Sequence, residues 1–178
     1  GSDVAVVLDL MIHDIDLVRT LVGGHVDDLA AVGVPVLTPS VDIANARLTF
    51  DSGAVANITA SRVSRERLRK IRIFQRTGYV SLDLASGTGE FYRLRTDVDF
   101  STIAKAPLAL EAFVERVVLD APDGEPLRLE LESFIAAVQG RTDVVVSGDD
   151  GREALAVALR INREIERTLP SLAGAVRA

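Results

Sequence analysis

The sequence predicts an α+β protein with an open, mostly antiparallel β-sheet that carries its helices on one face. Two observations lead to this fold class. Segments in which apolar and polar residues alternate fill the middle of the chain, and tight turns join them, which favours antiparallel pairing. Segments with helical periodicity lie towards the two ends of the chain. Strands and helices that are segregated along a chain are typical of α+β architecture.

A helix is predicted over residues 9–22, after a short extended entry. Residues 4–8 are apolar and rich in valine, which favours a strand. Apolar residues then recur over several turns of 9–22, and Asp9 can cap the first turn. Gly23 and Gly24 follow, and glycines are common where helices end.

A run of strands fills the middle of the chain. The alternation is clearest on both sides of the hairpin turn at 51–53. The predicted strands span residues 29–36, 42–50, 54–61, 70–75, 79–84, 91–95 and 113–119. Residues 96–110 follow neither period and are predicted to be irregular. One sheet face carries small or polar side chains, including Asn45, Asn57 and Thr59, so we expect it to be solvated or covered by another subunit.

Two helices are predicted to close the chain, over residues 127–139 and 150–168. The first has an apolar stripe and ends at Gly140. Asp149 and Asp150 lie near the start of the second, where a carboxylate complements the helix dipole. Pro170 is expected just beyond its end.

Composition restricts the class of protein. A chain of 178 residues suits one domain over residues 1–178, and 48% apolar with 26% charged residues is a globular composition. The absence of cysteine excludes disulfides and thiolate metal sites and agrees with a reducing cytoplasm. The net charge of −6 argues against general nucleic-acid binding, and no apolar run predicts a membrane span.

The first residues carry a further clue. Gly1 and Ser2 look like the remnant of a cleaved expression tag. Structured-looking sequence follows them at once. We therefore expect the chain to be a fragment of a longer protein, with part of the function on residues outside it.

One acidic, apolar stretch, "LDLMIHDIDL" at 8–17, holds one of the two histidines in the chain. If it is helical, Asp9 and His13 lie four residues apart on one face, with Asp16 near the same stripe. A carboxylate that orients an imidazole forms a recurrent proton-transfer pair. The alternative is a surface or capping feature. One histidine among aspartates is a poor zinc ligand set, so no metal is expected.

A basic stretch follows at 62–76, "RVSRERLRKIRIFQR", with seven lysines or arginines and one glutamate. One interpretation is a solvated loop and strand edge, whose charge discourages edge-to-edge pairing. The other is recognition of an anionic substrate, such as a sugar phosphate or a nucleotide sugar, through forked guanidinium contacts.

Three motifs in order resemble one family. "DLMIHDIDLVRTLVG" resembles the Asp-x-x-x-His-x-x-Asp segment that opens the C-terminal domain of the Gfo/Idh/MocA oxidoreductases. "RKIRIFQRTGYVSLDL" resembles the strand-turn-strand of that family, and "LELESFIAAVQGRTDVVVSGDDGREALAVALRINREI" resembles its closing helices. The wording of "DLMIHDIDL", "DIANARLTF" and "TASRVS" also resembles members that oxidise UDP-N-acetylglucosamine.

The resemblance implies a function, and it implies that a separate domain binds the cofactor. It implies an open sheet of the dihydrodipicolinate or glyceraldehyde-phosphate dehydrogenase C-terminal type, with His13 as general acid/base oriented by Asp9. It places Arg62 and Arg65 nearest the substrate cleft. NAD or NADP would be bound mainly by a separate Rossmann domain, since the chain contains no G-x-G-x-x-G.

The expected partners are a small carbohydrate or nucleotide-sugar substrate and further copies of the chain, held through the open sheet face. The fragment alone is expected to be inactive. The alternative is a non-catalytic binding or dimerisation module with the same fold.

Overall fold

The computed structural model describes residues 4–65, 68–95, 113–121 and 124–175, with side-chain surroundings up to residue 169. Two compact units are present: Gly1–Arg65 with Ala136–Ala178 forms unit 1, and Glu66–Ile135 forms unit 2. Each unit contains its own antiparallel sheet, of three strands in unit 1 and four in unit 2. Every strand pairing in the described residues is antiparallel, and the predicted α+β class is confirmed.

Unit 1 opens with a π-helix, η1 at Val7–Met11, which continues into the α-helix α1 at Ile12–Val22. Val7, Met11 and Ile15 are fully buried at intervals of four residues, so one face of this helical segment enters the core. Gly23 ends α1 with φ of 72°, a left-handed conformation that glycine adopts without steric cost.

The sheet of unit 1 has the order β1-β2-β3, built from Val26–Val34, Ile43–Phe50 and Val55–Ser61. Strand β2 shows how alternation sets its faces, since Ala44, Ala46 and Leu48 are fully buried while Asn45 and Arg47 are exposed. The polar face predicted from the sequence is therefore present on this sheet, with cross-strand hydrogen bonds between its side chains.

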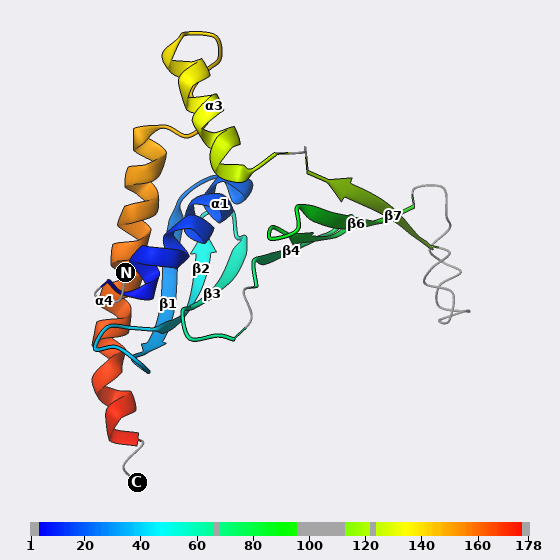
Figure 1. Cartoon of the computed structure of the whole chain (residues 1–178). Helices are drawn as coiled ribbons and strands as arrows, with labels where there is room; N and C mark the ends of the chain where they lie inside the picture. The colour runs from blue at the N-terminus through cyan, green and yellow to red at the C-terminus, as the bar shows by residue number, and fades with distance from the viewer. Residues whose placement is uncertain (1–3, 66–67, 96–112, 122–123, 176–178) are drawn as a thin grey trace, which may run out of the picture. The chain divides into compact units, whose positions relative to one another are not determined.

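Helix α4 at Gly148–Ala175 covers the other face of that sheet. It packs against β1, α1 and η1, and Figure 1 shows it running beside β1. Gly33 allows the close approach, because a Cβ at this position would lie 3.0 Å from Ile165 Cδ1. Ser147 and Asp150 form a capping box at its start. The Ser147 amide donates to Asp150 Oδ2 at 2.8 Å, and the Asp150 amide donates to Ser147 Oγ at 3.2 Å.

Unit 2 contains the sheet β4-β5-β6-β7, built from Lys70–Gln75, Gly78–Asp83, Thr88–Leu94 and Val114–Asp120. Phe74, Tyr79 and Tyr92 occupy paired positions on neighbouring strands and stack, with ring centroids 5.7 and 4.8 Å apart. The charged strand β4 forms one edge of this sheet, and Lys70 pairs with Asp83 of β5 at 3.3 Å.

Helix α3 at Pro126–Val138 matches the first of the two predicted closing helices and contains no buried residue. None of the described helices is both long and apolar enough to span a membrane. Residues 96–110, which are predicted to be irregular, lie outside the described residues.

Two local predictions are wrong. Residues 4–8 are not a strand, because Val6 and Val7 are both fully buried and the chain turns into η1. Consecutive buried residues suit a helix that is covered on a wide face, and the alternation of a strand would expose one of them. Helix α4 does not stop before Pro170 but continues to Ala175. Leu169, the residue before Pro170, packs against the core.

Candidate active site

Asp9 lies in the π-helix η1 and is the carboxylate that the sequence singled out. Its side chain is 40% exposed, while Val7 and Met11 on either side of it anchor the turn in the core. Single π-turns occur often at functional sites, since the wider turn changes the direction of a side chain. Asp9 therefore combines a fixed backbone with a carboxylate that solvent can reach.

Arg62 reaches Asp9 from the end of β3. Its Nη2 donates to Asp9 Oδ2 at 3.3 Å and to the carbonyl oxygen of Val4 at 2.6 Å. The side chain is only 14% exposed. A guanidinium that is this buried needs such partners, because an unpaired buried charge is strongly unfavourable.

Asp42 holds the other side of Arg62. Its carboxylate is fully buried, and Oδ1 lies 3.9 Å from Arg62 Nη1. Its own carbonyl oxygen accepts the Arg62 backbone amide at 3.0 Å. The guanidinium of Arg62 thus lies between a buried carboxylate and a partly exposed one.

The Asp42 carboxylate also organises the loop before β2. Oδ2 accepts the backbone amides of Val36, Leu37 and Thr38 at 2.8, 2.7 and 2.9 Å, and Oδ1 accepts the Thr38 hydroxyl at 2.8 Å. These hydrogen bonds, that from the Thr38 amide first, hold the pKa of Asp42 far below its ordinary value despite burial. Asp42 is therefore an ionised anchor inside the fold.

His13 and Arg65, two further residues predicted from the sequence, lie at the surface. His13, in the first turn of α1, is exposed, and within the described residues its ring has no hydrogen bond or ion pair. Asp9 and His13 are not hydrogen-bonded to each other, and the contact of Asp9 goes to Arg62. Arg65 is exposed and shows no ion pair among the described residues. Asp16 has one buried oxygen, Oδ1, that accepts no hydrogen bond from the described residues.

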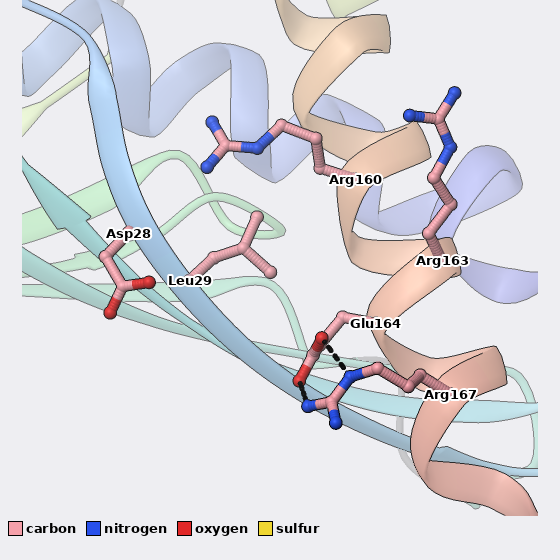
Figure 2. Close-up of a pocket in the computed structure, with 6 residues that line it drawn as sticks. All are labelled: Asp28, Leu29, Arg160, Arg163, Glu164 and Arg167. Carbon is pink, nitrogen blue, oxygen red and sulfur yellow. Dashed lines mark hydrogen bonds and ion pairs between the residues drawn. The ribbon is translucent and has the colours of Figure 1, made fainter.

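A separate open groove of about 300 Å³ lies between β1 and α4 in unit 1. Its lining consists of Asp28, Leu29, Arg160, Arg163, Glu164 and Arg167. Figure 2 shows Arg160 and Arg163 extending in different directions and Arg167 paired with Glu164. Arg160 donates to the carbonyl oxygens of Val26 and Asp27. The charges of this groove do not converge on one point, and no predicted site residue lines it.

Comparison with known proteins finds similarity to one family. Residues 3–81 match the GFO/IDH/MocA C-terminal domain. The chain is 36% identical over 167 residues to UDP-N-acetylglucosamine 3-dehydrogenase of Acidithiobacillus ferrooxidans, which covers 94% of this chain and 50% of that protein. Residues 3–81 thus resemble the GFO/IDH/MocA C-terminal domain, and nearly the whole chain resembles the half of that dehydrogenase that it covers.

Two further comparisons agree with this family. The solved structure of the Acidithiobacillus ferrooxidans enzyme superposes with a TM-score of 0.80 at 35% identity, over 94% of this chain and 50% of that one. An uncharacterized oxidoreductase of Bacillus subtilis, YrbE, is 25% identical over 92% of this chain and 46% of its own length. The chain thus spans about half the length of the curated relatives that it matches.

The similarity to the GFO/IDH/MocA C-terminal domain raises the question of a nicotinamide cofactor, and the described residues do not fit one on their own. A dinucleotide site of the Rossmann type needs a parallel strand-helix-strand unit with a glycine-rich turn. All described strand pairings are antiparallel; Gly87 lies in the turn between β5 and β6, and Gly89 lies within β6. Among the described residues there is also no cluster of three or more side chains suited to a metal ion.

Sequence reasoning missed Asp42 as a member of this site. A signal was present, because "LTPSVD" at 37–42 places an aspartate after a turn-forming Thr-Pro-Ser. The side chain of an aspartate in such a position often accepts backbone amides of the turn. Nothing in the sequence, however, indicates that the same residue lies beside Arg62.

Proposed function

We propose that residues 1–178 form the substrate-binding and dimerisation domain of an NAD(P)-dependent oxidoreductase. Its substrate would be a sugar or nucleotide sugar, oxidised at a hydroxyl group. One observation carries the proposal: 36% identity over 94% of the chain to a UDP-N-acetylglucosamine 3-dehydrogenase. NAD or NADP would supply the hydride acceptor and would be held mainly by a separate nucleotide-binding domain.

In this proposal His13 is the general acid/base. It takes the proton of the substrate hydroxyl during oxidation and returns it in the reverse direction. Its exposed ring supports this assignment, because a base must be reachable by the substrate. Asp9, one helical turn earlier, is the carboxylate that orients the ring. Arg65 is the proposed contact to an anionic part of the substrate, since its guanidinium is exposed.

A second candidate is a non-catalytic binding module with the same fold. The hydrogen bond of Asp9 to Arg62, with none to His13, favours it, because a structural carboxylate would make this contact too. The two candidates differ in whether the full-length protein turns over a sugar.

A substrate panel tests the proposal. The full-length protein that contains this chain is assayed with NAD and with NADP on UDP-N-acetylglucosamine, UDP-glucose, N-acetylglucosamine, glucose and inositol. We expect kcat/KM on a UDP-sugar to exceed that on the free sugars by roughly 10²-fold or more, because guanidinium groups recognise the diphosphate. Turnover of free sugars alone would remove the diphosphate argument, and no turnover of any of them would favour the binding module. The 178-residue chain assayed by itself is the control and is expected to be inactive.

We also propose that the polar face of β1, β2 and β3 binds a second copy of the chain. Asn45 donates to Thr59 at 2.7 Å and Arg47 to Asn57 at 3.1 Å, so this face is a preorganised polar surface next to exposed Val32. Light scattering should give twice the mass of one chain. Arg47→Glu should shift the protein towards monomer, because it removes the cross-strand hydrogen bond to Asn57 and places a negative charge on the proposed interface. A wild-type chain that stays monomeric at high concentration would contradict the proposal.

A further inference from the structure

We propose that Arg62 is a positioning residue that holds the Asp9 carboxylate in place and contacts no substrate. This replaces the substrate-binding role predicted from the basic stretch. The inference rests on the proposed function, in which Asp9 orients His13. It concerns four side chains or backbone groups of unit 1: Asp9, Arg62, Asp42 and the Val4 carbonyl.

Both terminal nitrogens of the Arg62 side chain are withdrawn from a ligand, one by its hydrogen bonds and the other by burial. Nη2 donates to both Val4 O and Asp9 Oδ2. Nη1 is buried, has no hydrogen bond and faces Asp42 Oδ1 at 3.9 Å. An anionic ligand would have to displace these partners to form the forked contact that makes arginine a good anion receptor. Arg65, in contrast, is exposed and shows no ion pair among the described residues.

Backbone hydrogen bonds hold the chain at Arg62 in a fixed position. Its backbone amide donates to Asp42 O at 3.0 Å, and Val6 N donates to Val41 O at 2.9 Å, so the chain around Asp42 holds both β3 and the entry to η1. Asp42 is fully buried and is itself fixed by the loop amides of residues 36–38. The guanidinium therefore has one immobile carboxylate behind it and one partly exposed carboxylate in front of it.

Among the described side chains that contact Arg62, Asp9 is the one that reaches solvent. With its side chain 40% exposed against 14% for Arg62, Asp9 is the member of the pair that faces solvent. Removal of the guanidinium frees the Asp9 carboxylate to rotate. Displacement of a catalytic group by about 1 Å can cost on the order of 10²-fold in rate. Substrate binding needs no such alignment.

The experiment is a double-mutant cycle in the full-length protein, with UDP-N-acetylglucosamine as substrate. The variants are Arg62→Met, Arg62→Lys, Asp9→Asn and the pair Asp9→Asn with Arg62→Met, and Arg65→Met is the matched arginine control. For each, kcat, KM, the equilibrium Kd for UDP-N-acetylglucosamine and the melting temperature are measured. Arg62→Lys keeps a positive charge that can reach Asp9, and it serves if Arg62→Met does not fold.

We expect Arg62→Met to lower kcat by roughly 10- to 100-fold with KM and Kd within about threefold, and Arg62→Lys to recover part of the loss. Arg65→Met should mainly raise KM and Kd. In the Asp9→Asn background, Arg62→Met should cost little more, because residues that act as a unit are not additive.

Two results would overturn the inference while leaving the proposed function standing: additive losses in the cycle, or a Kd raised by Arg62→Met as much as by Arg65→Met. If Asp9→Asn leaves kcat unchanged, the role of Asp9 in orienting His13 fails, and the inference that rests on it fails as well. A loss of melting temperature alone, with kcat of the folded fraction unchanged, also contradicts a positioning role.

Discussion

His13→Ala in the full-length protein should lower kcat on the sugar substrate by roughly 10²- to 10⁴-fold, the usual contribution of a general acid/base. The reason is that oxidation of a hydroxyl requires removal of its proton, and His13 is an exposed base one turn from Asp9. KM should change much less, because the imidazole acts mainly in the transition state. The measurement is steady-state kinetics over a range of pH. The kcat of the variant should no longer show the rise with pH that a catalytic base produces.

The chain offers a matched control for this change. His25 is the other of its two histidines, and it is exposed between α1 and β1. His25→Ala should leave kcat and KM unaltered. An active His13→Ala variant with unchanged kcat would refute the catalytic role of His13. Equal losses in both variants would indicate a general effect of removing a surface imidazole instead of proton transfer.

Most elements of the fold could be predicted because burial leaves a periodic trace in the sequence. In β2 the buried Ala44, Ala46 and Leu48 alternate with exposed residues, and the predicted strand 42–50 differs from Ile43–Phe50 by one residue. The glycine at the end of α1 was recognisable for a similar local reason, since Gly23 adopts φ of 72°.

Two features could not be read in this way. The valine-rich residues 4–8 have the composition of a strand, but the core of unit 1 buries Val6, Val7 and Met11 together and stabilises a helical turn. Pro170 has the chemistry of a helix stop, yet Leu169 packs against the core beside it. In both cases tertiary packing outweighs local preference.

The candidate site was predictable in its members but not in its connections. Asp9 and Arg62 were each singled out, the first by its spacing to His13 and the second by its place in a basic stretch. Their ion pair joins residues that are 53 positions apart in the sequence. The packing of β3 against η1 brings them together. Asp42 was missed because its role depends on that same tertiary arrangement.

The second large effect concerns stability and follows from Asp42. Asp42→Asn should lower the melting temperature at neutral pH by roughly 5–10 °C, because it removes the charge from several hydrogen bonds and leaves an NH2 donor in place of one of the two acceptor oxygens. It also removes the carboxylate behind Arg62 Nη1, which lies 3.9 Å away. Asp27→Asn is the control, since Asp27 is an exposed aspartate on β1, and it should change the melting temperature little.

The effect of Asp42→Asn should also depend on pH, with a sign that the structure fixes. The native hydrogen bonds lower the pKa of Asp42 below the 3.8 of an ordinary aspartate. Ionised Asp42 therefore contributes stability that is complete above pH values near 4 and is lost as the pH falls from there towards the lowered native pKa. The difference in melting temperature between wild type and variant should thus be largest at pH 7 and shrink in acid. A difference of the same size at pH 7 and in acid would show that the carboxylate charge is not what holds the loop at 36–38, and the account of how Asp42 supports Arg62 and Asp9 would fail with it.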